Sequence, residues 1–357
     1  MNNRYCIIMA GGIGSRFWPL SKNNYPKQFL DILGTGKSFI RSTFERFLPV
    51  VPAENFLVVT NAAYKSLVLE HLPELNPEQV LCEPMRRNTA PCLAYANYRI
   101  ESVCPDASIV VTPADHLVTN EVEFQRVIRL GMDFVEQPSH TDALLTIGIR
   151  PSRPETGYGY IRRVAGDTLT GDTLGEVCEV ESFKEKPNLE TAQAYLADGN
   201  YYWNSGIFIW SLPGIQQAYR SYLPDMVALF EKGRYLFNTP EEQDFINGMF
   251  PQCENISIDY GVMERSQSRY TIPADFGWSD IGTWGSLYEH VLHDDFGNAL
   301  NGNIVVEDTR NTVVNIQEGY EAVVEGLDHY LVALRDKSLL VCRLDDEQNI
   351  KHWIERL

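Results

Sequence analysis

Short apolar runs alternate with segments of helical periodicity along most of the chain, and this alternation constrains the fold more than any other feature. The apolar runs cover residues 5–10, 56–60, 107–112 and 143–149. Between them, apolar residues recur at helical spacing over 89–102 and 121–135. Strands that alternate with helices form a mostly parallel sheet covered on both faces, so we predict an α/β fold. Ligands of such sheets bind at the carboxyl ends of the strands.

The pattern changes from about Asn301, where apolar runs follow one another closely and no helical pattern intervenes. These runs cover residues 304–306, 312–314, 322–324, 330–334 and 339–342. Close, even spacing is typical of a small all-β unit, either a sandwich or a few coils of a β-solenoid. We therefore predict a catalytic domain over 1–290 and a β-rich domain over 291–357, which ends in a helix from Gln348 to Leu357 and serves packing or oligomerisation.

Composition and charge exclude several classes of protein. A chain of 357 residues can bury a core without disulfides, and its seven cysteines are scattered with no C-x-x-C pair. The formal charge of −18 at pH 7 argues against nucleic-acid binding. No apolar run approaches a membrane span and the N-terminus lacks a signal-peptide pattern, so we expect a cytoplasmic protein that binds no membrane. Phosphate ligands would be held locally, by a few cations, backbone N–H groups or a divalent cation.

A glycine-rich loop follows the first apolar run. It contains Gly11, Gly12 and Gly14, with Arg16 directly behind them. Glycines let backbone N–H groups approach an anion, and a guanidinium adds planar donors for phosphate. A tight turn after the first strand of any α/β protein would show the same pattern. Phe17 stands where the dinucleotide-binding fingerprint requires glycine, which disfavours a hydride-transferring enzyme.

Two lysines follow this loop in different contexts. Lys27 stands behind Pro26, which restricts the backbone so that the ammonium can be aimed at phosphate; an ordinary surface lysine is the alternative. Lys37 follows Gly36 in a segment that looks like the end of a P-loop, but that motif requires glycine at the position of Asp31. We interpret this segment as a turn that enters a helix.

The segment 10–30, with G-G-x-G-[ST]-R-x-W-P-L followed by P-K-Q-F-L, resembles the mannose-1-phosphate guanylyltransferases, also called GDP-mannose pyrophosphorylases. Further motifs of that family follow in order: R-R-N-T-A-P (86–91), P-A-D-H (113–116), E-T-G-Y-G-Y-I (155–161), F-K-E-K-P (183–187), W-N-S-G-I-F (203–208) and G-W-S-D-I-G-T-W (277–284). Collinear motifs are far more specific than one loop. Ser15 replaces the common threonine and Lys184 the usual valine, but neither change removes a group that the chemistry needs.

The resemblance implies a Rossmann-like nucleotidyltransferase fold of the glycosyltransferase-A type, with a mixed sheet and a small β-rich, β-solenoid-like C-terminal region. It implies that GTP and mannose 1-phosphate react to give GDP-mannose and pyrophosphate. Some relatives carry a further mannose-6-phosphate isomerase domain; this chain ends at Leu357, so we expect the short form without that activity. We also expect a homodimer.

The resemblance also assigns site residues. Arg16, Lys27 and Lys186 are the catalytic cations, and Asp115 and Asp280 are the ligands of a Mg²⁺ ion. The nucleotide-binding residues are Ala10, Gly11, Gly12, Gly14, Ser15, Glu83, Arg86, Asn88, Thr89 and Asp115. The sugar-binding residues are Gly157, Tyr158, Gly159, Glu185 and Asn204. From the residues alone, Asp115 and Asp280 would more often be cap or turn carboxylates than functional groups, and Thr89 could equally be a helix cap.

The implied chemistry needs no protein base. A phosphate monoester is largely dianionic near pH 7, since its second pKa is about 6, so a sugar 1-phosphate oxygen can attack the α-phosphorus of GTP directly. Catalysis then consists of aligning two anions and stabilising the charge on the α-phosphate and pyrophosphate. His116 is therefore interpreted as structural. Two alternatives stay open: another sugar or base, and a non-catalytic regulatory relative, which the retained cations and carboxylates disfavour.

Overall fold

The computed structural model describes residues 3–12, 14–164 and 177–357. The chain divides into two units that interleave along the sequence. The first unit comprises Met1–Gly11, Phe44–Ala114 and Val118–Trp278, and the second comprises Gly12–Thr43, Asp115–Leu117 and Ser279–Leu357. The domain boundary at residues 290 and 291 stays a prediction.

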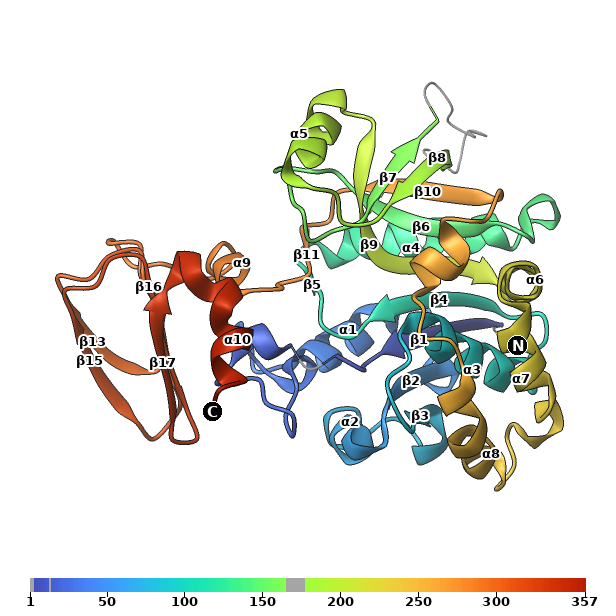
Figure 1. Ribbon diagram of the computed structural model, residues 1–357, viewed down its shortest axis with the longest axis horizontal. Helices are drawn as coiled ribbons and strands as arrows, with labels where there is room; N and C mark the ends of the chain where they lie inside the picture. The colour runs from blue at the N-terminus through green and yellow to red at the C-terminus, as the bar shows by residue number, and fades with distance from the viewer. Residues whose placement is uncertain (1–2, 13, 165–176) are drawn as a thin grey trace. The chain divides into compact units, whose positions relative to one another are not determined.

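A nine-stranded sheet forms the centre of the first unit, in the order β3-β2-β1-β4-β9-β6-β10-β8-β7 (Figure 1). Its strands are β1 (Arg4–Met9), β2 (Phe56–Asn61), β3 (Val80–Glu83), β4 (Ser108–Pro113), β6 (Leu144–Ile149), β7 (Tyr160–Arg163), β8 (Cys178–Lys184), β9 (Tyr201–Ser211) and β10 (Arg269–Ala274). The first four strands of the chain pair in parallel, as predicted. The sequence did not reveal that β9 runs antiparallel to both β4 and β6.

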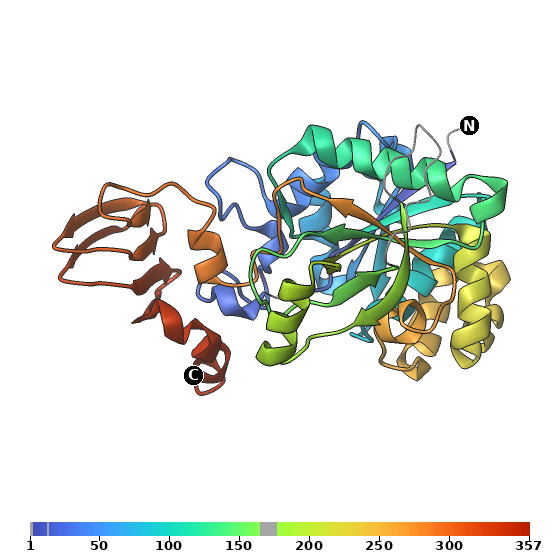
Figure 2. The same ribbon diagram turned by 90° about the horizontal axis from the view of Figure 1, so that it is seen from above.

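Helices cover both faces of this sheet (Figure 2). The α-helices between residues 39 and 249 are α1 (Phe39–Phe47), α2 (Lys65–His71), α3 (Thr89–Glu101), α4 (Glu121–Val135), α5 (Leu189–Asp198), α6 (Leu212–Tyr222), α7 (Pro224–Glu231) and α8 (Glu242–Met249). Helix α3 shares a core with α6 and α7 on the face that carries Ile7 and Ile109. Helix α4 packs closely against the opposite face. Gly131 of this helix leaves no room for a side chain, since a Cβ there would lie 2.5 Å from Ile209 Cδ1 on β9. The predicted helices over 89–102 and 121–135 are confirmed.

The second unit is rich in short strands after α9 (Trp284–Tyr288): β12 (Ala299–Asn301), β13 (Asn303–Glu307), β14 (Val313–Ile316), β15 (Glu321–Glu325), β16 (Tyr330–Arg335) and β17 (Ser338–Arg343). They form a four-stranded sheet, β12-β14-β16-β17, and a pair, β13-β15. All pairings are parallel except that of β17, which returns antiparallel to β16. The β-rich prediction is confirmed. The terminal helix is shorter than predicted: a 3-10 helix (Leu344–Asn349) precedes α10, which covers only Ile350–Ile354.

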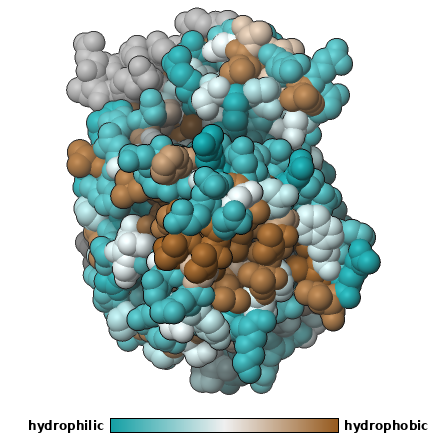
Figure 3. Space-filling view, turned by 90° about the vertical axis from the view of Figure 1, so that its left-hand side faces the viewer, coloured by the Kyte–Doolittle hydropathy of each residue, from teal (hydrophilic) through white to brown (hydrophobic). Residues whose placement is uncertain are grey.

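Apolar side chains gather on one face of this β-rich part (Figure 3). Val305 on β13 and Val323 on β15 are paired in register and exposed, as are Leu339 and Val341 on β17. Alternate residues of the same strands, such as Val324 and Leu340, face the interior. Among the helices of the described residues, none is both long and apolar enough to cross a membrane.

Candidate active site

The ammonium of Lys27 joins the two segments that carry the predicted metal ligands. Its Nζ donates to the carbonyl oxygen of Asp115 at 2.9 Å and to that of Asp280 at 2.6 Å, and forms an ion pair with Asp115 Oδ2 at 3.0 Å. The Lys27 side chain is buried, and its Nζ lies 4.9 Å from the ring centre of Phe39. Two segments that are far apart in sequence, each carrying one predicted metal ligand, are thus joined by one cation.

The Asp115 carboxyl is held in its ionised form. Burial by itself would raise its pKa, but the Lys27 ammonium and the charge of His116 outweigh burial and hold the pKa below its usual value. Asp115 follows the end of β4 by two residues, as the strand pattern predicts. Within the described ranges, no three His, Cys, Asp or Glu side chains converge on a common metal position. Any metal held here would take most of its ligands from substrate and water.

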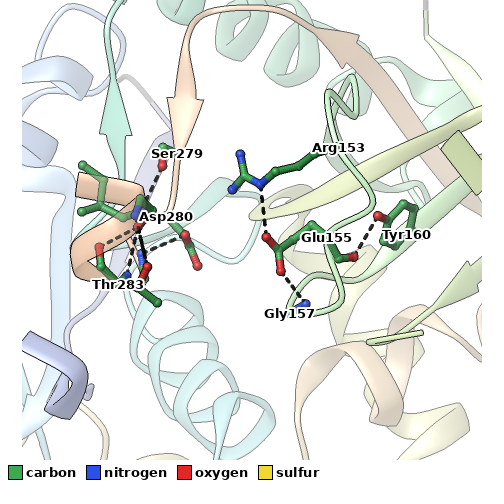
Figure 4. Close-up of polar contacts among 10 residues, drawn as sticks. Arg153, Glu155, Gly157, Tyr160, Ser279, Asp280 and Thr283 are labelled. Carbon is green, nitrogen blue, oxygen red and sulfur yellow. Dashed lines mark hydrogen bonds and ion pairs between the residues drawn. The ribbon is translucent and has the colours of Figure 1, made fainter. Parts of the chain in front are cut away.

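Asp280 lies in a strained turn (Figure 4). Its Oδ1 accepts from the N–H of Gly282 at 3.0 Å, and the Ser279 hydroxyl accepts from the N–H of Ile281 at 3.1 Å. Ile281 has a φ of 40°, which is an unfavourable conformation for a β-branched residue. The surrounding contacts hold this strain, because Ile281 is fully buried. Strain of this kind clusters at functional sites.

Lys27 also packs against the glycine-rich loop, at Gly14. Gly14 has a φ of 70°, and a Cβ there would collide with Lys27 Cβ, so only glycine fits. Ser15 and Arg16 follow in a 3-10 helix (Ser15–Phe17), and Arg16 is exposed. Its guanidinium is accessible to an anion, whereas the described contacts of Lys27 Nζ all go to Asp115, Asp280 and aromatic rings. A direct contact of Lys27 with phosphate stays a prediction.

The P-loop-like segment is a turn that enters a helix, as predicted. The Asp31 carboxylate accepts from the N–H of Thr35 at 2.9 Å and from that of Gly36 at 2.6 Å, and α1 begins at Phe39. The backbone donors that a phosphate would need are therefore occupied by a carboxylate.

Glu83 is a buried carboxyl at the end of β3, in the first unit. Its Oε1 has no hydrogen-bond partner among the described residues, and a Cβ on Gly11 would lie 3.8 Å from its Oε2. Burial raises its pKa to about 8, although Cys92 and the Arg86 cation oppose this shift. The group is thus protonated near neutral pH. Ala10, which precedes Gly11 at the end of β1, is fixed by its carbonyl, which accepts from Thr60 Oγ1 at 2.8 Å.

Asn88 and Thr89 stand at the start of α3. Asn88 has φ 68° and ψ −171°, a region that is otherwise almost restricted to glycine, and its side chain accepts from the N–H of Thr89. The cap of α3 is therefore Asn88, and the interpretation of Thr89 as the cap is wrong. The Thr89 hydroxyl accepts instead from the N–H of Ile258 at 2.8 Å.

Glu155 holds in place the loop of residues 157–159, which is predicted to bind the sugar (Figure 4). Its Oε1 accepts from the N–H of Gly157 at 2.9 Å, its Oε2 pairs with Arg153 at 3.3 Å, and its carbonyl accepts from the Tyr160 hydroxyl at 2.8 Å. The Tyr158 ring packs edge-on against Trp203 and Trp278. Sequence patterns had placed this loop in the site but gave Glu155 no role.

Glu185, Lys186, Asn204 and Gly159 form one cluster. Lys186 Nζ lies 2.9 Å from Glu185 Oε1, and although burial opposes the shift, this contact raises the pKa of Lys186. The N–H of Lys186 donates to the carbonyl of Tyr158, and that of Asn204 donates to the carbonyl of Gly159. A Cβ on Gly159 would lie 2.5 Å from Glu185 Oε2, so glycine is needed there. Lys186 itself has a φ of 45°.

Sequence reasoning missed Asp259, which joins this cluster. Its Oδ1 accepts from Asn204 Nδ2 at 2.9 Å. No motif or periodicity marks it, because it lies 55 residues from Asn204 and outside every family motif quoted above. Only the tertiary contact identifies it.

Comparisons with known proteins identify the family of the chain. The sequence profile of the nucleotidyl transferase family matches residues 5–295. The mannose-1-phosphate guanylyltransferase ManC of Salmonella typhimurium is 39% identical over 361 residues, covering 99% of this chain and 73% of the relative. The Xanthan biosynthesis protein XanB of Xanthomonas campestris is 36% identical, covering 98% of this chain and 72% of its own length. A crystal structure described as mannose-1-phosphate geranyltransferase from Thermus thermophilus superposes with a TM-score of 0.86 at 29% identity, covering 99% of both chains.

Proposed function

The chain belongs to the nucleotidyltransferase family and, within it, to the mannose-1-phosphate guanylyltransferases, and on this basis we propose that it converts GTP and mannose 1-phosphate into GDP-mannose and pyrophosphate. The observation that carries the proposal is the Lys27 ammonium, which holds the Asp115 and Asp280 segments together beside the glycine-rich loop. An enzyme that must receive two anions needs such a preorganised arrangement of charges.

We propose Mg²⁺ as the cofactor. Carboxylate oxygens suit this ion, which usually takes one or two from the protein and the rest from phosphate and water, so Asp115 and Asp280 fit as its ligands. When bound, the ion would neutralise charge on the triphosphate and on the departing pyrophosphate. The low pKa of Asp115 supports this assignment, because an ionised carboxylate is available at neutral pH.

The chain's own groups then hold the substrates. Exposed Arg16 and the N–H groups near Gly11 and Gly12 bind the triphosphate, and Lys186, whose raised pKa keeps it charged, binds the phosphate of the sugar. The attacking oxygen needs no base, because the monoester is already largely dianionic at a second pKa of about 6. Alignment and charge stabilisation account for catalysis.

The choice of base rests on Glu83. Guanine presents two adjacent donors, N1–H and the N2 amino group, and a carboxylate can accept from both; adenine presents an acceptor at N1. Near neutral pH the free protein keeps a proton on Glu83. The two donors of guanine would favour release of that proton to solvent, because hydrogen bonds to the charged form stabilise it, and the carboxylate, whose Oε1 is otherwise unpaired, would then accept from both. Buried polar groups left without partners by a wrong base strengthen discrimination.

A pyrophosphate-release assay tests the proposal. Four nucleoside triphosphates are paired with several sugar 1-phosphates, with and without Mg²⁺. We expect a strong preference for GTP with mannose 1-phosphate and no turnover after chelation. Preference for another base or sugar would favour a related nucleotidyltransferase, and binding of GDP-mannose without any turnover would favour a regulatory relative.

Replacing Glu83 by Gln should lower kcat/KM for GTP by about 10- to 100-fold, because one of two acceptors becomes a donor. Activity with ATP should change much less. Exposed Glu78, on the turn before β3, provides the matched control Glu78→Gln. An equal loss for both nucleotides in Glu83→Gln would remove Glu83 from base recognition.

Glu83→Gln has a second consequence for stability. The folded protein keeps a proton on Glu83 up to about pH 8, whereas the unfolded chain releases it near 4.5, so this group makes stability fall as pH rises between these values. The variant should therefore gain, relative to wild type, roughly 3 kcal/mol in the free energy of unfolding between pH 5 and pH 8. Urea unfolding at the two pH values measures this difference.

Two proposals concern the β-rich part: its β-solenoid form and its role in dimerisation. Parallel pairing of β12, β14 and β16 supports the proposal of a short β-solenoid. The exposed apolar side chains Val305, Val323 and Val341 support the proposal of a homodimer through this face.

A further inference from the structure

Asp259 begins a single turn of π-helix (Asp259–Met263) between α8 and β10. Such turns are rare and often lie at functional sites. The turn is held firmly: the N–H of Ile258 donates to the Thr89 hydroxyl at 2.8 Å, and Ile258, Val262 and Met263 are fully buried. The carboxyl of Asp259 is therefore placed by the core and not by a mobile loop.

The amide of Asn204 is oriented by its neighbours so that its NH₂ group faces Asp259. Asn204 Oδ1 accepts from the N–H of Gly206 at 3.2 Å and lies 3.1 Å from the Thr146 hydroxyl. Its Nδ2 donates to Asp259 Oδ1 at 2.9 Å. An amide with its oxygen engaged in this way has little left to accept a sugar hydroxyl. Asn204 is better suited to positioning Asp259 than to reading the sugar by itself.

The charge of a second carboxylate, that of Glu185, acts on Asp259. Burial and the like charge of Glu185 raise the pKa of Asp259 to about 6, against the opposing effects of Asn204 and Lys186. Glu185 contacts Gly159 and Lys186, so both acids lie in the cluster assigned to the sugar and its phosphate. Two carboxylates held together at a cost in free energy indicate a use that requires both.

We propose that Asp259 is a specificity-determining residue of the sugar site, where it and Glu185 form a pair of acceptors for hydroxyl groups of a hexose 1-phosphate. This inference rests on the proposed function, because it assumes that the Glu185–Lys186 cluster binds the sugar substrate. A carboxylate has about four lone-pair positions and Asn204 fills one of them. A sugar whose hydroxyl is missing or inverted would leave a charged acceptor without a donor, which discriminates far more than lost contact area.

The test pairs one variant with a series of sugars. Wild type, Asp259→Asn and the control Asp244→Asn, an exposed residue of α8, are assayed with mannose 1-phosphate and its monodeoxy analogues at positions 2, 3, 4 and 6. Asparagine keeps the shape and can still accept from Asn204, but presents a donor where the carboxylate presents an acceptor. We expect Asp259→Asn to lose about 10- to 100-fold in kcat/KM with mannose 1-phosphate. One analogue lacks the hydroxyl that Asp259 contacts. With this analogue, the wild type should already show the same loss in kcat/KM, and Asp259→Asn should show no further loss relative to the wild type.

The outcomes separate the two hypotheses. If the wild type turns over no sugar 1-phosphate, the proposed function fails. If the wild type is active and Asp259→Asn loses the same factor on every analogue, or loses nothing, the role of Asp259 is refuted while the function stands. Asp259→Ser is assayed in parallel, with thermal melting of each variant, so that a folding defect in one substitution does not obscure the pattern across the sugars.

Discussion

Replacing Asp280 by Asn is expected to lower kcat by about a thousandfold or more while the protein stays folded. The variant removes a charged ligand of the proposed Mg²⁺ but keeps an oxygen that can accept from the N–H of Gly282. The contact between Lys27 and this segment goes to the carbonyl of Asp280 and not to its carboxylate, so the substitution leaves that contact intact. Steady-state pyrophosphate release over a range of Mg²⁺ concentrations measures the loss.

Asp275→Asn provides the matched control, because Asp275 is exposed on the same connection five residues earlier. It should leave kcat unchanged. Asp115→Ala should also be nearly inactive, but it removes the partner of the Lys27 ammonium and should lose stability as well. Full activity of both folded variants, Asp280→Asn and Asp115→Ala, would end the metal assignment.

Replacing Lys27 by Met is expected to affect stability and activity together. Methionine can fill the space beside Phe39, but the variant leaves the partly buried Asp115 carboxylate without its cation. Breaking one partner of a buried ion pair typically costs about 3–5 kcal/mol, and the two carboxylate segments lose their common donor, so we expect kcat to fall by at least about a hundredfold. Urea unfolding and the pyrophosphate assay measure the two effects.

The stability loss of Lys27→Met should depend on pH. The pKa of Asp115 is depressed in the folded protein, so its contribution is present above the unfolded value of 3.8 and is lost as pH falls through the folded pKa. The difference in the free energy of unfolding between wild type and Lys27→Met should therefore become smaller as the pH falls. Lys37→Met, in the P-loop-like turn, is the control and should change neither quantity. A stability gap that is constant between pH 7 and pH 3 would contradict the ion pair as its source.

Local patterns in the sequence predict the helices and strands well where capping and periodicity agree. Helix α4 matches its predicted bounds, because Asn120 caps it by accepting from the N–H of Glu123 and its apolar residues repeat at helical spacing. The prediction of the terminal helix is wrong because no such cap is present there. Acidic residues and no side-chain cap precede Ile350, and the chain forms a 3-10 helix first.

The reversed strand β9 shows a limit of such patterns. A strand buried on both faces between β4 and β6 is apolar whichever way it runs, so its composition carries no information on direction. The false P-loop shows another limit: a missing glycine disfavours phosphate binding, but only the contacts of Asp31 show which group occupies the loop.

By itself, the sequence determined the alternation of strands and helices, the β-rich end and the family. These features are encoded locally, in periodicity, capping and contiguous motifs. Only the tertiary structure decided that Lys27 joins the Asp115 and Asp280 segments and that Asn204 turns its amide toward Asp259. Hydrogen bonds between residues 55 to 253 positions apart depend on how the strands pair, and no local pattern specifies that pairing.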